Sequence, residues 1–201
     1  MTDEGYIKFQ ADWKMVHPLP ADDLHEINHY RQRLYDRGLI GAYPNGIGYG
    51  NISGRYSKDG LFIISGSKTG NLESLDERHY ALVTEVRPAD NFLRCEGPVI
   101  ASSESMSHAA IYDYCPEVQA VIHIHHLEMW QRLMHRVPTT DASAPYGSPE
   151  MVDSIRQLLR DTRLREQRIF VMEGHEEGVF TFGESFAAAE RVLYDWLEEG
   201  P

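Results

Sequence analysis

The sequence predicts an α/β protein in which helices cover a mixed β-sheet, and two observations support this fold class. Apolar runs of strand length interleave with segments of helical periodicity along most of the chain. The strand-like runs of the first half follow one another through short turns, which is typical of antiparallel neighbours. A purely parallel sheet would need a long crossover between consecutive strands, so we expect a mixed sheet.

The first half of the chain is expected to begin with an irregular segment, residues 1–20, and to continue with a helix over 21–37. Asp22 or Asp23 can cap this helix, and Gly38 can end it. Four short apolar runs then read as strands, because each is bounded by turn-forming residues. After a glycine-rich loop, these strands are predicted over 51–56, 61–65, 80–86 and 91–95.

The second half alternates helices with strands. Serines at positions 102 and 103 are typical of a helix start, and the β-branched run that ends at His125 is typical of a buried strand. Helices are predicted over 102–114, 127–135, 149–161 and 184–198, and strands over 118–125, 168–172 and 178–182. These helices can supply the layers that cover the sheet.

Composition narrows the class of protein. A chain of 201 residues is expected to form one domain, residues 1–201, and 42% hydrophobic residues are ordinary for a globular protein. No apolar run approaches the roughly 20 residues that span a bilayer, and the acidic start does not read as a signal peptide. Since Cys95 and Cys115 form no metal-type pair, we expect a reduced protein in the cytoplasm.

The charge of the chain bears on its partners. A net charge of −12 would repel a phosphate-rich polymer, so we expect no nucleic-acid partner. A small anion can still bind where backbone N–H groups and a helix N-terminus collect it.

The stretch "AVIHIHHLE", residues 120–128, contains the first candidate site. Side chains alternate between the two faces of a strand, so His123 and His125 point the same way. Two imidazoles side by side are half of a metal site, because a catalytic zinc usually has three protein ligands and one open position. The alternative is that both histidines are simply solvated or hydrogen-bonded at a strand end.

Further candidate residues lie elsewhere in the chain. His175 falls in a turn between two predicted strands, and Glu104 falls in the first turn of a predicted helix, where a carboxylate is favoured. Such a carboxylate can ligate a metal or move a proton, although it can also be only a helix-terminal charge. Ser102 and Ser103 at the helix start, with the small residues of "GNIS" (50–53) and "SGSKTG" (65–70), can approach an anion closely.

Taken in chain order, "GNIS", "ISG", "SSE", "HIH" and a late histidine before "GVFTFG" resemble the class II aldolase/adducin family over roughly residues 22–198. The resemblance implies a three-layer αβα sandwich around a central mixed, largely antiparallel sheet. It also implies a homotetramer with active sites at subunit interfaces.

Site residues follow from the resemblance position by position. It implies that zinc, or another divalent transition metal such as Mn²⁺ or Co²⁺, is bound by His123, His125 and His175. It implies that Glu104 is the general acid/base beside the metal. The positions that bind the phosphate of a substrate correspond to Asn51, Ser65, Gly66, Ser102 and Ser103.

Several positions depart from the family pattern. Ser105 replaces the usual tryptophan after "SSE", and the late histidine is followed by two glutamates, Glu176 and Glu177. The stretch between "HIH" and "APYGS" is about ten residues shorter than in sugar-phosphate aldolases of the family. No tyrosine matches the catalytic tyrosine of that stretch, and Tyr146 and Asp141 are the nearest substitutes.

Three functions therefore remain open. The first is a metal-dependent lyase that makes aldol or retro-aldol cleavage of a small hydroxy-ketone or sugar phosphate through a metal-stabilised enediolate. The second keeps the metal and changes the reaction to decarboxylation or epimerisation. The third is a non-catalytic, adducin-like scaffold, which the three retained histidines disfavour. A glutamate after the two serines favours the aldolases over the epimerases.

Overall fold

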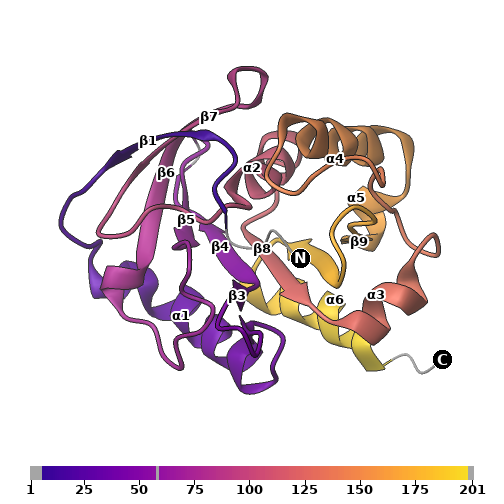
Figure 1. The fold of residues 1–201 in the computed structure, drawn as a ribbon, viewed down its shortest axis with the longest axis horizontal. Helices are drawn as coiled ribbons and strands as arrows, with labels where there is room; N and C mark the ends of the chain where they lie inside the picture. Colours follow the sequence, from indigo (N-terminus) through magenta and orange to yellow (C-terminus); the bar gives the residue numbers. More distant parts are fainter. Residues whose placement is uncertain (1–5, 58, 199–201) are drawn as a thin grey trace.

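The central layer of the computed structural model, which describes residues 6–57 and 59–198, is one eight-stranded sheet (Figure 1). The strands lie in the order β1-β7-β6-β5-β4-β8-β10-β9. β1 and β7 run parallel, whereas every other neighbouring pair is antiparallel. The expectation of a mixed, largely antiparallel sheet is confirmed.

Except for β1, which no predicted run covers, the strand bounds follow the predicted runs to within about two residues. The main sheet contains β1 (Gln10–Lys14), β4 (Asn51–Arg55), β5 (Phe62–Ser65), β6 (Tyr80–Arg87), β7 (Phe92–Glu96), β8 (Ala120–His125), β9 (Ile169–Val171) and β10 (Gly178–Gly183). A small hairpin of two-residue strands, β2 (Gly41–Ala42) and β3 (Gly48–Tyr49), begins just before the predicted glycine-rich loop, residues 43–51, and ends within it. It was not predicted, because two residues are too few to show a strand period.

The helices are as follows: α1 (Ala21–Asp36), α2 (Ser105–Tyr114), α3 (Leu127–Leu133), α4 (Pro149–Asp161), α5 (Leu164–Gln167) and α6 (Phe186–Glu198). Two short 3₁₀ turns occupy Glu77–His79 and Pro88–Asp90. Among the described helices, none is both long and apolar enough to cross a membrane.

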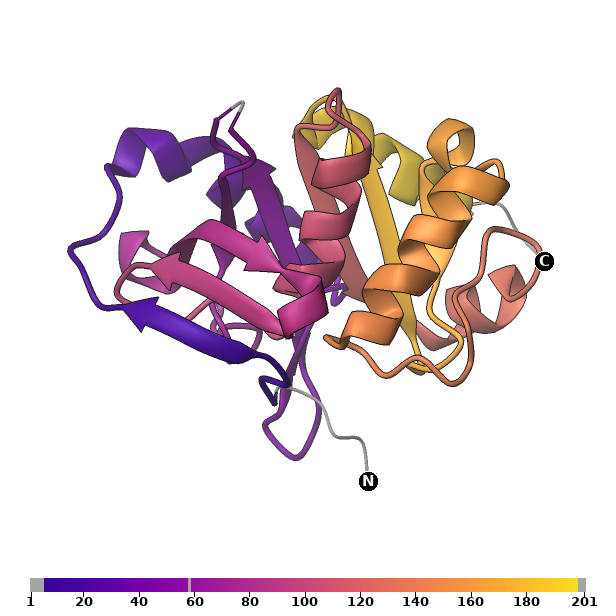
Figure 2. The ribbon, with the colours of Figure 1, turned by 90° about the horizontal axis from the view of Figure 1, so that it is seen from above.

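The helices form two layers because the strands between them are apolar on both faces. Successive residues of β8, Val121 and Ile122, enter two different apolar clusters. Side chains of α2 and α4 join the first cluster, and side chains of α1, α3 and α6 join the second. Figures 1 and 2 show α2 and α4 together on one face of the sheet. The predicted three-layer arrangement is therefore confirmed.

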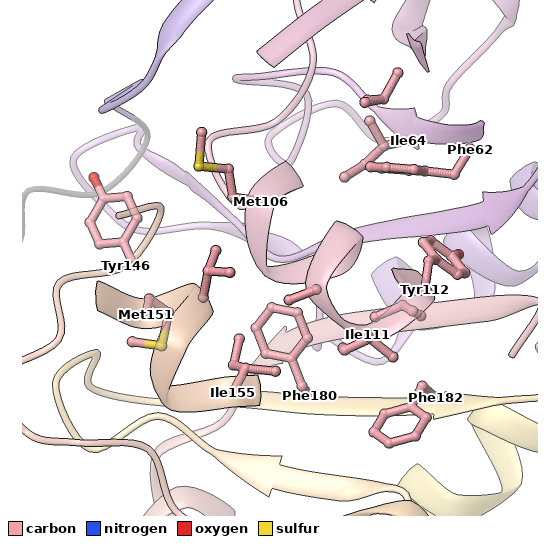
Figure 3. Packing of buried hydrophobic residues seen from close by; sticks show 14 of the residues in the cluster. Phe62, Ile64, Met106, Ile111, Tyr112, Tyr146, Met151, Ile155, Phe180 and Phe182 are labelled. Carbon is pink, nitrogen blue, oxygen red and sulfur yellow. The ribbon is translucent and has the colours of Figure 1, made fainter. Parts of the chain in front are cut away.

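The face covered by α2 and α4 is packed with large side chains. Figure 3 shows Phe180 and Phe182 of β10 under Ile111 of α2 and Ile155 of α4. The ring of Phe180 also stacks on the imidazole of His123, with 4.3 Å between centroids. This face of the sheet thus connects the apolar core to the candidate site.

The N-terminal segment departs from expectation. Residues 10–14, expected to be irregular, form β1 at the outer edge of the sheet beside β7 (Figure 2). Every side chain of β1 is exposed, so the strand has no buried face and its sequence shows no alternation of apolar and polar residues. Residues 1–5 of the predicted segment lie outside the described residues.

The predicted cap of one helix and the predicted start of another also need correction. Pro20 occupies the N-cap of α1, so Asp22 and Asp23 lie in the first turn and cap nothing through a side chain. α2 begins at Ser105, three residues later than predicted, and Glu104 is its N-cap residue. The two serines before Glu104 consequently belong to the loop that enters the helix.

Candidate metal and anion site

Strand β8 places two histidines on one face of the sheet, as the alternation of side chains predicts. His123 and His125 lie on the face covered by α2 and α4, and both are buried. Their Nε2 atoms are 3.2 Å apart. The pair therefore points its ring nitrogens at a common position rather than into solvent.

The third histidine, His175, lies 50 residues after His125 in the chain. β10 pairs antiparallel with β8, with Gly178 opposite His125, and His175 stands in the turn just before Gly178. A Cβ at Gly178 would lie 2.8 Å from the His175 ring, so glycine allows this close approach. The His175 Nε2 atom lies 3.1 Å from His125 Nε2. The structure thus brings together all three predicted ligands.

The hydrogen bonds of the other ring nitrogens assign the protons. His123 Nδ1 is 3.3 Å from the carbonyl oxygen of Val179, which can only accept, so Nδ1 carries the hydrogen. His125 Nδ1 is 2.7 Å from the hydroxyl of Tyr43, and that hydroxyl donates its own hydrogen to the Glu177 carboxylate at 2.5 Å. Nδ1 of His125 must therefore donate to Tyr43, and both histidines present an unprotonated Nε2 to the cluster.

Two lone pairs facing each other at 3.2 Å repel unless a cation lies between them. Three nitrogens held tetrahedrally at the zinc–nitrogen distance of about 2.0–2.1 Å would lie about 3.3 Å from one another. Two of the three Nε2 separations, 3.1 and 3.2 Å, are close to this value, and the ligand atoms of all three histidines lie within 4.8 Å of one another. The cluster of His123, His125 and His175 therefore fits a divalent metal ion.

Burial keeps these ligands in the form that a metal requires. Loss of hydration lowers the pKa of His123 and His175 well below the ordinary value, and the mutual repulsion of the cluster adds to this effect. The pKa of His125 is also lowered by burial, although the nearby Glu177 carboxylate opposes the shift. Neutral imidazoles with free Nε2 lone pairs are metal ligands, whereas protonated ones are not.

Glu104 is a buried carboxyl at the N-terminus of α2. Its Oε2 accepts a hydrogen bond of 2.9 Å from the Ser107 hydroxyl, and its Oε1 has no hydrogen-bond partner among the described residues. Burial raises the pKa of Glu104 to about 7, while the Ser107 hydrogen bond and the charge of Lys8 oppose the rise. A carboxyl with this pKa can both give and take a proton near neutral pH.

The five predicted anion-binding positions meet where β4 begins, β5 ends and the loop before α2 passes. The Ser65 hydroxyl accepts the Ile52 N–H at 3.2 Å, and Gly66 bridges to Ala101, next to the two serines. These positions are all buried or half-buried: Asn51, Ser65, Gly66, Ser102 and Ser103. Asn51 is also paired with His123 across β4 and β8, which joins the anion positions to the histidine cluster.

Tyr43 and Glu177 are parts of the site whose roles were not foreseen from the sequence. Tyr43 stands in the glycine-rich loop, where the sequence directed attention to glycine and serine rather than to a side chain that reaches His125. Glu177 has a left-handed backbone, with φ of 69°, and lines an open cavity together with Tyr43 and Tyr49. The doubled glutamate after His175 was the only signal, and its other member, Glu176, is exposed.

The two proposed substitutes for the missing tyrosine have different surroundings. The Tyr146 ring lies against the His175 ring, with 4.8 Å between centroids, and the Lys8 ammonium lies 3.8 Å from the Tyr146 centroid. Asp141 is exposed, and its carboxylate accepts hydrogen bonds from Ser143. Tyr146 is therefore the member of this pair that contacts the histidine cluster.

Comparisons with known proteins agree with this geometry. Residues 26–198 match the family described as the class II aldolase and adducin N-terminal domain, whereas no curated protein sequence matched the chain. An L-fuculose 1-phosphate aldolase has a similar structure, with a TM-score of 0.65 and 19% identity over 90% of this chain and 86% of that one.

Two further solved structures are similar. YgbL from Klebsiella pneumoniae, described with aldolase, epimerase and decarboxylase as its candidate activities, gives a TM-score of 0.63 and 18% identity over 88% of this chain and 86% of that one. A sugar-phosphate aldolase from Thermotoga maritima gives a TM-score of 0.59 and 18% identity over 90% and 97%. At these identities the likeness concerns the fold.

Proposed function

Because the chain belongs to the class II aldolase and adducin family, we propose that it is a metal-dependent lyase that cleaves a small hydroxy-ketone or sugar phosphate by a retro-aldol reaction. The observation that carries this proposal is the convergence of unprotonated Nε2 atoms from His123 and His125, completed by His175. An adducin-like scaffold would have no need for such an arrangement of buried lone pairs.

The three histidines would hold the metal, and zinc, manganese or cobalt would suit this donor set. When bound there, a divalent metal supplies a Lewis acid that draws electron density from the substrate carbonyl. Asn51 and the hydroxyls of Ser65, Ser102 and Ser103 would hold the anionic group of the substrate, and Gly66 would let it approach the backbone.

We assign the proton transfer at carbon to Glu104. In a retro-aldol cleavage, the bond between the carbon next to the carbonyl and the hydroxyl-bearing carbon breaks. The hydroxyl loses its proton to water and the carbon that bears it becomes the aldehyde carbon, while the other carbon gains a proton. With a pKa of about 7 and one oxygen without a protein partner, Glu104 can deliver that proton and remove it in the reverse direction.

A decarboxylase or epimerase on the same metal site is the second candidate. The similarity to YgbL, whose description carries these activities, favours keeping it. Both reactions would still use the histidine cluster and an anion-binding group, so they differ from the first proposal in substrate rather than in site.

Assembly and location form part of the same proposal. We propose that residues 1–201 act as one class II aldolase-like domain within a homotetramer, as the family resemblance implies, and light scattering of the purified protein would measure its mass. A cytoplasmic location is supported by the two cysteines, Cys95 and Cys115, which are both buried and unpaired.

The experiment that tests the function joins metal content to a substrate panel. Purified protein is stripped with a chelator, reloaded with zinc, manganese or cobalt, and assayed with ketose phosphates, beginning with L-fuculose 1-phosphate, for release of an aldehyde. We expect one metal per chain in the wild type and none bound by His123→Ala. Equal metal in both proteins would contradict the ligand assignment.

Glu104→Gln separates chemistry from metal binding. The substitution keeps the shape of the side chain and removes the titrating group, so we expect turnover to fall by about 10²–10⁴-fold with the metal retained. If Glu104 were only a helix-terminal charge, turnover would stay near normal and the free energy of unfolding would change by about 1 kcal/mol at most.

A further inference from the structure

A chain of buried hydrogen bonds runs through the core beside the site, and neither the metal nor the proton transfer uses it. Ser53 of β4 contacts Tyr112 and His108 of α2, with 2.8 Å between the hydroxyl oxygens and 2.7 Å between Ser53 Oγ and His108 Nδ1. His108 Nε2 in turn lies 2.7 Å from Oδ1 of Asn51. All four side chains are buried, and Asn51 is the most exposed of them at 7%.

The direction of this chain follows from its Asn51 end. Asn51 Oδ1 can only accept, so the neutral His108 ring carries its hydrogen on Nε2 and donates it to Oδ1. His108 Nδ1 is then an acceptor and takes the hydroxyl hydrogen of Ser53. The Ser53 oxygen in turn accepts the hydrogen of the Tyr112 hydroxyl.

This direction determines which end of the Asn51 amide is available to a ligand. With Oδ1 held by His108, the remaining atom is Nδ2, which has two N–H donors and no acceptor. Asn51 lies opposite His123 across β4 and β8, so the amide stands beside the histidine cluster. A flipped amide would present Oδ1 instead and would repel an anion.

We propose that His108 is a positioning residue that, through Ser53 and Tyr112, holds the Asn51 amide with its N–H donors toward a phosphate-type anion of the substrate. The proposal rests on the proposed function, because the anion site is part of that function. It assigns a role to a buried histidine that is neither a metal ligand nor an acid/base group.

The test measures binding of inorganic phosphate by calorimetry and zinc affinity by competition with a chelator. Ser53→Ala removes the donor that keeps the hydrogen on His108 Nε2, and we expect phosphate to bind about tenfold more weakly or worse, with zinc affinity unchanged. Tyr112→Phe leaves the Ser53 hydroxyl in place and should weaken phosphate binding less. With substrate, Ser53→Ala should raise KM and leave kcat near normal.

The matched control is Thr181→Val. Thr181 is as buried as Ser53, but its hydroxyl donates to the Ala189 carbonyl and lies outside the relay. This variant loses a buried hydroxyl of the same kind, and we expect it to bind phosphate as the wild type does. Circular dichroism confirms that each variant is folded before binding is measured.

A second readout follows the ring itself. Nitrogen NMR of labelled protein should show the His108 hydrogen on Nε2 in the wild type and a shift toward Nδ1 in Ser53→Ala. A wild-type hydrogen on Nδ1, or a Ser53→Ala protein with unchanged phosphate affinity, would overturn the proposal. Wild type that binds zinc but no phosphate would overturn it as well, while the metal-dependent lyase proposal would stand.

Discussion

His125 and His108 are both buried, both have a lowered pKa, and both belong to a hydrogen-bond chain that contains a tyrosine, yet they present opposite chemistry to the site. The chain behind His125 ends at the Glu177 carboxylate, which draws the ring hydrogen outward and leaves a lone pair facing inward. The chain behind His108 ends at a hydroxyl, which supplies a hydrogen and leaves an N–H facing Asn51.

The difference shows that the residue type alone does not determine what a buried histidine can bind. A carboxylate at the end of the chain prepares the ring for a cation, because the tyrosine hydroxyl donates to the carboxylate and the ring must then donate to that hydroxyl. A hydroxyl at the end can donate to the ring, and the ring then donates onward toward an anion. Metal affinity and phosphate affinity should therefore respond to different variants.

The largest expected effect is on metal affinity, through Tyr43→Phe. Without the hydroxyl, His125 Nδ1 loses its acceptor and the ring loses the partner that orients it, so zinc should bind about 10–100-fold more weakly. Competition with a chelator measures this affinity. Glu177→Gln should act in the same direction, since an amide holds the tyrosine less strongly than a carboxylate.

Tyr112→Phe is the control for this comparison, because it removes a tyrosine hydroxyl from the other chain. We expect its zinc affinity to equal that of the wild type. A loss of zinc affinity as large as that of Tyr43→Phe would mean that the two chains are not independent.

The second prediction concerns acid stability and His108. Burial lowers the pKa of His108 to about 3, whereas an unfolded histidine titrates near pH 6.5. Below pH 6.5 the unfolded chain binds the extra proton, so stability that is present above pH 6.5 is lost as the pH falls, by about 1.4 kcal/mol per pH unit.

His108→Gln isolates this contribution, because glutamine keeps a polar donor and does not titrate in this range. Urea unfolding of the metal-free proteins between pH 7 and 5 should give a steeper loss for the wild type, by about 2 kcal/mol at pH 5. The other histidines are shared by both proteins and cancel in the difference. Parallel curves would show that folding does not lower the pKa of His108.

The smallest expected effect comes from His126, the next residue of the same motif. Its Nδ1 accepts the Met129 N–H at 3.1 Å and caps helix α3, and it is not a member of the metal cluster. His126→Ala should cost about 1 kcal/mol of stability, measured by urea unfolding, without changing zinc affinity. His126→Asn should restore the cap, and a loss of zinc from either variant would contradict this assignment.

Local patterns predicted the parts of the site that depend on local geometry. Alternation along β8 was enough to place His123 and His125 together, because the period of a strand is two. His175 was recognised by its order among the motifs, but its position in space could not be predicted, since that position depends on the pairing of β10 with β8. For the same reason nothing in the sequence joined Tyr43 to His125, which are 82 residues apart.

The helix starts show a second limit. Glu104 was expected inside the first turn, but the loop before α2 continues through Ser103, whose carbonyl packs closely against Gly147. This contact comes from a distant segment, and capping preferences describe only neighbours in the chain. Likewise β1 is stabilised by partners on β7, such as Arg94, whose guanidinium lies 2.7 Å from Asp12.

The pairing of β1 with β7 also has a consequence for synthesis on the ribosome. The partner of Gln10 is Phe92, so β1 leaves the ribosome long before β7 exists. At about 5–20 residues per second, the interval is roughly 4–16 s. During that interval an apolar strand would be exposed to aggregation, whereas β1 offers glutamine, aspartate and lysine to water. The mostly polar sequence of β1, which shows no strand pattern, thus also lowers its tendency to aggregate before β7 is synthesised.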